Sequence, residues 1–430
     1  MAFYSNRLFW PVDRAVRSFR IYVVEPYRYA PDEHAAVFNA AINSLVSPVV
    51  PEVSDSTDYS IPYDAGPFDL VTFPEAFLPV DAFLAALEPI AKLPRCGCVH
   101  VGLRPSSGEQ HLFKVSELKT LVEKIGAMPG VENNDLSSFK KWIDDQSLGR
   151  LFNLGCVFAV DADRRLRVCL HPKIIKSKFE IGMLHENSMT EADLLTLISL
   201  VPRDKRFLAI TIQPLLCSDA LNGDTDRPGA RPLYAVNEDN GACFGEMSTD
   251  HIDVVSLATC TPQPEYGIPQ DSHPQWHPAF QETFYRAASD DALWKHHHAV
   301  FAFSNFRMVA EERSGGLSGG FIPVSLSDTR IPEFISVSVW GRPETPPTAD
   351  KWSAPNEAVG ANRAWRSHGY IASLRPTIPE NAARMIGFTV NKLPRQASRW
   401  RTHNGLTDFQ LFVASMSGSC NTLTFKQQVY

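Results

Sequence analysis

Residues 68–103, FDLVTFPEAFLPVDAFLAALEPIAKLPRCGCVHVGL, contain the alternation from which a fold class can be predicted. The first apolar run is short and stops at Pro74, so it predicts a buried strand followed directly by Glu75. Leu, Phe and Ala recur at helical spacing over 80–91, and residues 96–103 again have the apolar character of a strand. Strand, helix and strand in this order are typical of α/β proteins.

The same alternation continues along most of the chain. We expect further strands and helices as follows: strands at 18–24, 154–160, 165–171, 207–216, 252–258 and 299–306, and helices at 34–44, 190–200 and 279–288. Two charged or turn-rich stretches near 106–149 and 221–248 interrupt the pattern, and we interpret them as insertions. A Pro-rich linker at 342–348 predicts one domain over 1–340 and a C-terminal extension over 341–430, which is a candidate interface.

The composition is that of a globular protein, with 44% hydrophobic, 10% aromatic and 21% charged residues among 430. A formal net charge of −7 gives no reason to expect nucleic acid or an anionic membrane as a partner. No run approaches the roughly 18 apolar residues of a membrane span, and the first residues lack the apolar core of a signal peptide, so we expect a cytoplasmic protein. Eight cysteines are too sparse for a disulfide scaffold and indicate reduced thiols.

Three polar residues, Glu75, Lys173 and Cys217, each follow a predicted strand. Lys173 comes directly after a predicted hairpin, and Cys217 follows an apolar run in which Gln213 and Pro214 indicate a bend or an edge strand. The carboxyl ends of strands are where open α/β architectures gather their sites. A thiol that attacks a carbonyl or nitrile carbon needs a base for its proton and a cation or N–H groups for the developing negative charge. A carboxylate, an ammonium group and a thiol are such a set.

Three segments that contain these residues resemble the successive motifs of the nitrilase superfamily of carbon–nitrogen hydrolases, in the family's order. They are Asp69-Leu-Val-Thr-Phe-Pro-Glu75-Ala-Phe-Leu-Pro79, the hairpin with Pro172-Lys173 after it, and Leu215-Leu-Cys217-Ser-Asp219. The segments 275–282, 299–305 and 318–323 resemble the helix, the late strand and the glycine turn that follow in the family. The likeness covers roughly residues 16–325, apart from the insertions.

The resemblance implies a four-layer α-β-β-α sandwich that carries a Glu-Lys-Cys triad. Glu75 would be the general base, Cys217 the nucleophile, and Lys173 the cation that supports the tetrahedral oxyanion. The backbone N–H of Ser218 would be a second donor to the oxyanion, and Ser218 and Asp219 would border the substrate.

Further details of the triad also come from the resemblance. Glu180 lies close to the position at which many members carry a second glutamate, which orients the lysine and the substrate. Lys173 lacks the neighbours that are usual in the family, so Lys176 and Lys178 are alternatives for the triad lysine. The chemistry of such a triad needs no cofactor.

Two clusters of potential metal ligands have simpler interpretations. Cys96 and Cys98 have no second Cys/His pair at the spacing of a zinc site, so we favour packing in the core. His296, His297 and His298 are consecutive, and consecutive residues of a helix point in different directions. We therefore predict no metal site.

These features together predict a thiol-dependent hydrolase of non-peptide carbon–nitrogen bonds in a small molecule. The resemblance favours an amide or carbamoyl group over a nitrile, and it also implies a homo-oligomer, either a dimer or a larger assembly. Two alternatives stay open. One is a nitrilase-fold interaction or scaffold subunit whose site is degenerate or depends on a partner. The other is an acyltransferase that uses the same triad with an amine as acceptor.

Overall fold

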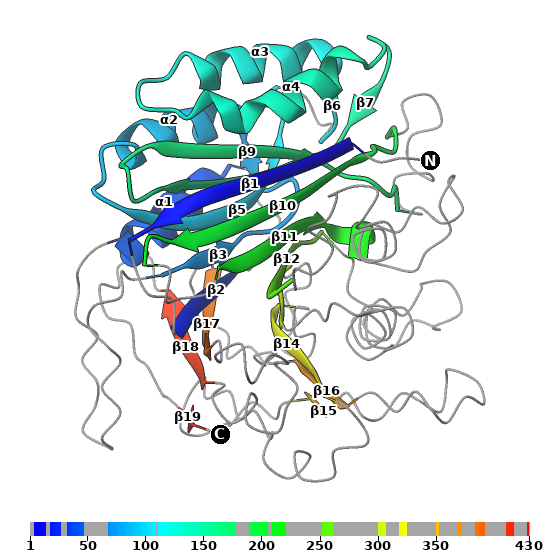
Figure 1. The fold of residues 1–430 in the computed structure, drawn as a ribbon. Helices are drawn as coiled ribbons and strands as arrows, with labels where there is room; N and C mark the ends of the chain where they lie inside the picture. Colours follow the sequence, from blue (N-terminus) through cyan, green and yellow to red (C-terminus); the bar gives the residue numbers. More distant parts are fainter. Residues whose placement is uncertain are drawn as a thin grey trace, which may run out of the picture.

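The described part of the chain is a mixed α/β structure built around two large β-sheets (Figure 1). The computed structural model describes residues 4–13, 18–26, 32–46, 68–107, 111–177, 189–204, 209–220, 252–260, 300–306, 318–324, 350–351, 368–371, 383–391, 410–416 and 428–429.

The strands of each sheet come from distant parts of the sequence. The first sheet consists, in order across it, of β1 (Tyr4–Val12), β10 (Leu194–Pro202), β11 (Ile210–Leu216), β12 (Val254–Ala258), β13 (Val300–Ser304), β14 (Gly319–Val324), β16 (His368–Ile371) and β15 (Asp350–Lys351). The second consists of β19 (Gln428–Val429), β18 (Gln410–Met416), β17 (Ala383–Asn391), β2 (Ser18–Pro26), β3 (Leu70–Thr72), β5 (Cys96–Arg104), β8 (Leu154–Val160) and β9 (Leu166–Pro172), with β4 (Leu78–Pro79) beside β5. A short separate pair is formed by β6 (Phe113–Lys114) and β7 (Leu151–Phe152).

Both faces of the second sheet are buried at β3, β5, β8 and β9, where successive side chains point to opposite faces. On β5, Val99 and Val101 pack into a hydrophobic core with residues of the helices. His100, between them, points the other way and hydrogen-bonds Ser256 of β12 in the first sheet. The first sheet packs on this inner face, with β12 over β3 and β5, β11 over β8, and β10 over β9.

Helices cover the outer face of the second sheet (Figure 1). They are α1 (His34–Val46), α2 (Val80–Ile90), α3 (Val115–Gly126), the 3-10 helix η1 (Asn133–Leu136) and α4 (Ser137–Asp144). In α2 the buried residues Phe83, Ala86, Leu87 and Ile90 recur at helical spacing, so one stripe of the helix faces the sheet. The described residues thus form three layers, one of helices and two of sheet. The helix predicted at 279–288 lies outside the described residues.

A chain of buried polar side chains joins the two sheets. The hydroxyls of Thr72 and Ser256 are 2.7 Å apart, and Ser256 Oγ is 2.8 Å from His100 Nδ1. His100 Nε2 is in turn 3.1 Å from His171 Nε2 on β9. The His171 ring lies over Gly155, where a Cβ atom would be 2.3 Å from His171 Nε2. Burial lowers the pKa of His171 to about 3 and lowers the pKa of His100 as well, so both imidazoles are neutral.

Most of the predicted local elements are confirmed, but one is wrong. The predicted strands at 18–24, 96–103, 154–160, 165–171, 252–258 and 299–306 correspond to β2, β5, β8, β9, β12 and β13, and the predicted helices at 34–44 and 80–91 to α1 and α2. The predicted helix at 190–200 is instead β10, which begins at Leu194. Its largely apolar run has no period, because side chains on both of its faces are buried.

Strand β1 has no counterpart among the predicted elements, although its sequence contains a strand signal. Asn6, Leu8 and Trp10 are buried, and the residues between them are exposed or half-buried. This period of two is that of a strand with one covered face. β1 pairs in parallel with β10 over its whole length.

The strands described after residue 340 extend both sheets. β16 pairs with β14 in the first sheet, and β17 pairs with β2 in the second over nine residue pairs, from Ala383 with Pro26 to Asn391 with Ser18. The stretch 106–149 contributes α3, η1 and α4 to the helical layer. Within the described residues, no helix is both long enough and apolar enough to cross a membrane.

Candidate active site

The side chains of Glu75 and Lys173 meet at one end of the sandwich. Lys173 Nζ donates to Glu75 Oε1 at 2.7 Å, and the two side chains are only 2% and 5% exposed. Removing two charges from water costs several kcal/mol for each ion, so a buried ion pair of this kind is weak evidence for stability. The pair therefore suggests a role in chemistry.

A tight turn holds Glu75 in place after β3. The N–H of Gly102 on β5 donates to Pro74 O at 3.0 Å, and Phe77 N–H donates to Gly102 O at 2.9 Å. Ala76 has a φ of 50°, in the left-handed region. A Cβ atom at position 102 would lie 2.3 Å from Ala76 N and 2.4 Å from Glu75 Cα, so the turn can approach β5 only because residue 102 is glycine.

Two further donors bind the Glu75 carboxylate. Asn153 Nδ2 donates to Oε1 at 2.8 Å, and the backbone N–H of Cys260 donates to Oε2 at 3.2 Å. Asn153 also binds the lysine segment, because its backbone oxygen accepts from Lys173 N–H at 2.9 Å. Asn153 is not among the site residues predicted from the sequence. Its only sequence signal is a polar residue inside the apolar run Leu151-Phe-Asn-Leu-Gly-Cys156.

Cys217 lies at the carboxyl end of β11 with a φ of 39° and begins the 3-10 helix η2 (Cys217–Ala220). A non-glycine residue in the left-handed region is uncommon and costs of order 1–3 kcal/mol, and such residues cluster at functional sites. The residue is buried and carries a reduced thiol. Because Leu216 pairs with Ala258, the turn at Cys217 lies beside the end of β12, whose next residues bind Glu75.

Asp219 connects this cysteine turn to the lysine segment. Its Oδ1 accepts from the N–H groups of Ile174 and Ile175, each at 2.8 Å, and its Oδ2 accepts from Leu216 N–H at 3.1 Å. Burial raises the pKa of Asp219 to about 7, although the backbone donors and the charge of Lys173 act in the opposite direction.

The remaining predicted site residues lie as follows. Ser218 is buried, and its hydroxyl donates to Ile175 O. Lys176 is half-buried, and its backbone N–H donates to Glu191 Oε1 at 3.2 Å. Lys178 and Glu180 are outside the described residues. Among the described lysines, Lys173 is the one whose ammonium group reaches Glu75.

Pro214 lies inside the sheet, in a segment of β11 that pairs with a neighbouring strand on one side only. β11 lies between β10 and β12 in the strand order, so it is not an edge strand. The ladder with β10 ends at the pair Ile198 with Ile212, so residues 213–216 pair with β12 alone. A proline fits in this segment because one of its sides carries no ladder.

Four other described cysteines are buried thiols. Burial raises the pKa of Cys96 to about 12, and it also raises the pKa values of Cys98, Cys156 and Cys169. Packing of Cys96 and Cys98 in the core is confirmed, since both are buried. In the part of the chain that the structure describes, no group of three or more His, Cys, Asp or Glu side chains could hold a metal ion.

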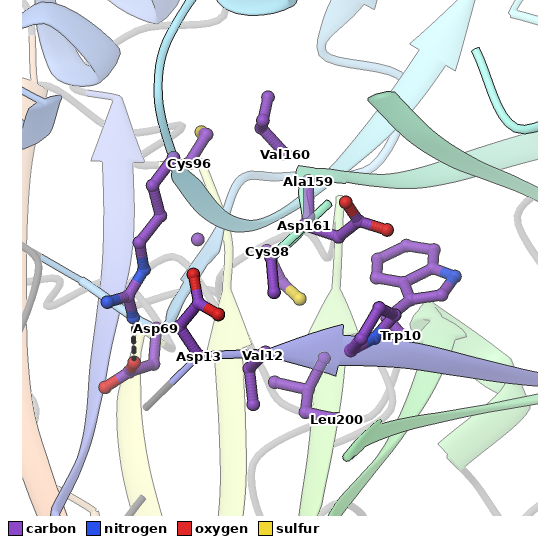
Figure 2. Close-up of a pocket in the computed structure, with 14 residues that line it drawn as sticks. Trp10, Val12, Asp13, Asp69, Cys96, Cys98, Ala159, Val160, Asp161 and Leu200 are labelled. Atoms are coloured by element: carbon purple, nitrogen blue, oxygen red, sulfur yellow. Dashed lines mark ion pairs between the residues drawn. The ribbon is translucent and has the colours of Figure 1, made fainter. Parts of the chain in front are cut away.

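A small cavity lies at the opposite end of β3 from Glu75, and Figure 2 shows residues that line it. Asp69, which precedes β3, and Cys96, which begins β5, line it together with Trp10 and Asp161. Arg95 closes one side through an ion pair with Asp69 at 3.6 Å. Its volume of about 30 Å³ has room for a water molecule or two, so it is too small for a substrate.

Comparisons with known proteins show a distant structural likeness. The sequence matches no protein-family model and no curated protein. A solved structure that is similar to the chain is the crystal structure of carbon-nitrogen hydrolase from Helicobacter pylori G27. The alignment covers 72% of this chain and 82% of that chain, with 9% sequence identity and a TM-score of 0.37. These values are too low to assign the chain to a family.

Proposed function

We propose that this protein is a thiol-dependent hydrolase of non-peptide carbon–nitrogen bonds in small molecules, acting on an amide or carbamoyl group rather than a nitrile. The observation that supports the proposal is the buried contact between Lys173 and Glu75, next to the strand end that carries Cys217 in a left-handed conformation. In this proposal a base, a cation and a thiol are gathered at one end of the sandwich, which a further helical layer on the first sheet would complete as a four-layer α-β-β-α sandwich.

In the first half of the reaction, Glu75 accepts the proton of the Cys217 thiol. The sulfur attacks the carbonyl carbon and forms a tetrahedral oxyanion, which the Lys173 ammonium group and the Ser218 N–H stabilise. The carbon–nitrogen bond then breaks. The leaving nitrogen takes the proton from Glu75 and departs as ammonia or an amine, and the acyl group stays on sulfur as a thioester.

In the second half, Glu75 takes a proton from a water molecule, and the resulting hydroxide attacks the thioester carbon. The carbon–sulfur bond breaks, and the proton held by Glu75 returns to the sulfur of Cys217. Glu180 would orient Lys173 and the substrate, and Ser218 and Asp219 would border the substrate. Each cycle consumes one water molecule and leaves the protein unchanged.

The proposal can be tested without a known substrate by alkylation with iodoacetamide, followed residue by residue with mass spectrometry from pH 5 to 9. We expect Cys217 to react faster than the four other buried thiols, Cys96, Cys98, Cys156 and Cys169. The variants Glu75→Gln and Lys173→Met should each slow Cys217 by at least about 100-fold at pH 7, the lower range of general-base effects.

Matched controls are available in an exposed ion pair. Lys92 and Glu88 form a contact at 3.1 Å with 73% and 72% exposed side chains, so Glu88→Gln and Lys92→Met change the same residue types outside the site. They should leave Cys217 alkylation unchanged. If Cys217 reacts no faster than the buried thiols, or if both site variants behave like these controls, the proposed function is wrong.

A further inference from the structure

We propose that Asn153 is a positioning residue for the general base, which holds Glu75 so that Oε2 is the oxygen that accepts the Cys217 proton. This inference rests on the proposed function. Asn153 contacts both the base and the lysine, and it is not itself one of the three residues of the proposed triad.

The contacts of Asn153 fix two members of the site at once. Its side-chain amide donates to Glu75 Oε1 at 2.8 Å, and its backbone oxygen accepts from Lys173 N–H at 2.9 Å. The residue is 1% exposed, and it lies in the short link between β7 and β8. A planar amide in a packed interior has few alternative positions, whereas a lysine ammonium group is a point charge on a flexible stem.

The donors are distributed unequally over the two oxygens of Glu75. Each carboxylate oxygen has two lone-pair directions. Within the described residues, Oε1 accepts from both Lys173 Nζ and Asn153 Nδ2, so both of its directions are used. Oε2 accepts from Cys260 N–H at the longer distance of 3.2 Å, which leaves one direction for a proton.

The position of Oε2 agrees with this assignment. Cys260 follows β12, and β12 pairs in parallel with β11 up to Leu216, the residue before Cys217. The oxygen with an open direction is therefore on the side of Glu75 that carries the backbone next to the nucleophile. Without Asn153, the plane of the carboxylate could turn about its terminal bond, so that no oxygen with an open lone-pair direction would be held on the side of Cys217.

The test compares the pH profile of Cys217 alkylation in wild type, Asn153→Ala and Asn153→Asp. Loss of one charge-assisted donor makes the carboxylate easier to protonate, so the acid limb of the profile should move to higher pH in Asn153→Ala. The rate at pH 7 should fall about tenfold. Asn153→Asp keeps the shape of the side chain, but it places a second carboxylate against Glu75, so the same shift should be larger.

Asn6→Ala is the matched control. Asn6 is 0% exposed, and its side-chain amide donates to Cys169 Sγ at 3.5 Å, in β1 and away from Glu75. Its loss should lower the thermal stability without moving the pH profile. If wild type shows Glu75-dependent reactivity and both Asn153 variants keep the profile of Asn6→Ala, the role of Asn153 is refuted and the proposed function stands. If wild type lacks Glu75-dependent reactivity, the proposed function itself fails, and this inference fails with it.

Discussion

Acidification from pH 7 to pH 4 should remove about 3 kcal/mol of stability through His171 alone. Burial lowers the pKa of this imidazole from 6.5 to about 3 in the folded protein. In the unfolded chain the imidazole recovers its ordinary pKa. Between these two values the unfolded state binds a proton that the folded state does not bind, so the free energy of unfolding falls as the pH falls.

The magnitude follows from the interval that is titrated. Each pH unit below 6.5 costs about 1.4 kcal/mol until the folded pKa is approached, and pH 4 lies above that value. The contributions of Asp219 and Asp135 to the change in stability have the opposite sign, because burial raises their pKa values to about 7 and about 6. In the folded protein each of these carboxyl groups holds a proton that the unfolded chain releases, so acidification stabilises the folded state through them. A comparison with a variant of His171 alone removes their contribution.

The assay is urea unfolding at pH 7, 6, 5 and 4, followed by tryptophan fluorescence and circular dichroism in wild type and His171→Gln. The glutamine keeps a hydrogen-bonding group beside His100 and does not titrate. We expect the loss of unfolding free energy between pH 7 and pH 4 to be about 3 kcal/mol smaller in the variant. His111→Gln, at a half-buried histidine outside the network, controls for the loss of a histidine. Equal losses in wild type and His171→Gln would refute the reasoning.

Two further predictions concern packing and charge. Gly102→Ala places a methyl group against the backbone of Glu75, which cannot move aside as a flexible side chain could. We expect the free energy of unfolding in urea to fall by about 2 kcal/mol. Alkylation of Cys217 should become at least tenfold slower. Arg167→Ala removes the guanidinium group whose Nε and Nη2 donate to the two carboxylate oxygens of Asp135, each at 2.7 Å. Because the buried carboxylate then lacks its ion-pair partner, the free energy of unfolding should fall by about 3 kcal/mol in the same assay.

Each of these two variants has a matched control. Gly149→Ala adds the same methyl group where no atom lies within 4 Å, and it should be nearly neutral. Lys92→Ala breaks the exposed pair with Glu88 and should change stability by less than about 1 kcal/mol. A Gly102→Ala protein with wild-type alkylation, or an Arg167→Ala protein as stable as Lys92→Ala, would contradict the respective prediction.

Elements whose signals lie within a few residues of one another could be predicted from the sequence. The stop at Pro74 and the helical spacing of α2 are local, and so is the turn between β8 and β9, where Asp161 Oδ1 accepts from the N–H groups of Asp163 and Arg165. The apolar run of β10 is different, because burial on both faces erases the period that separates a strand from a helix. Only its ladders with β1 and β11 show that it is a strand.

The candidate site divides in the same way. A carboxylate, a lysine and a cysteine after predicted strands were visible in the sequence, because a strand end is marked by the residues around it. The tertiary structure decided that Lys173, and not Lys176, reaches Glu75, and that Asn153 binds the same carboxylate. These contacts join residues 98 and 78 positions apart. Their formation depends on the order of the strands across each sheet and on which side chains alternate inward, and no local pattern of residues encodes either.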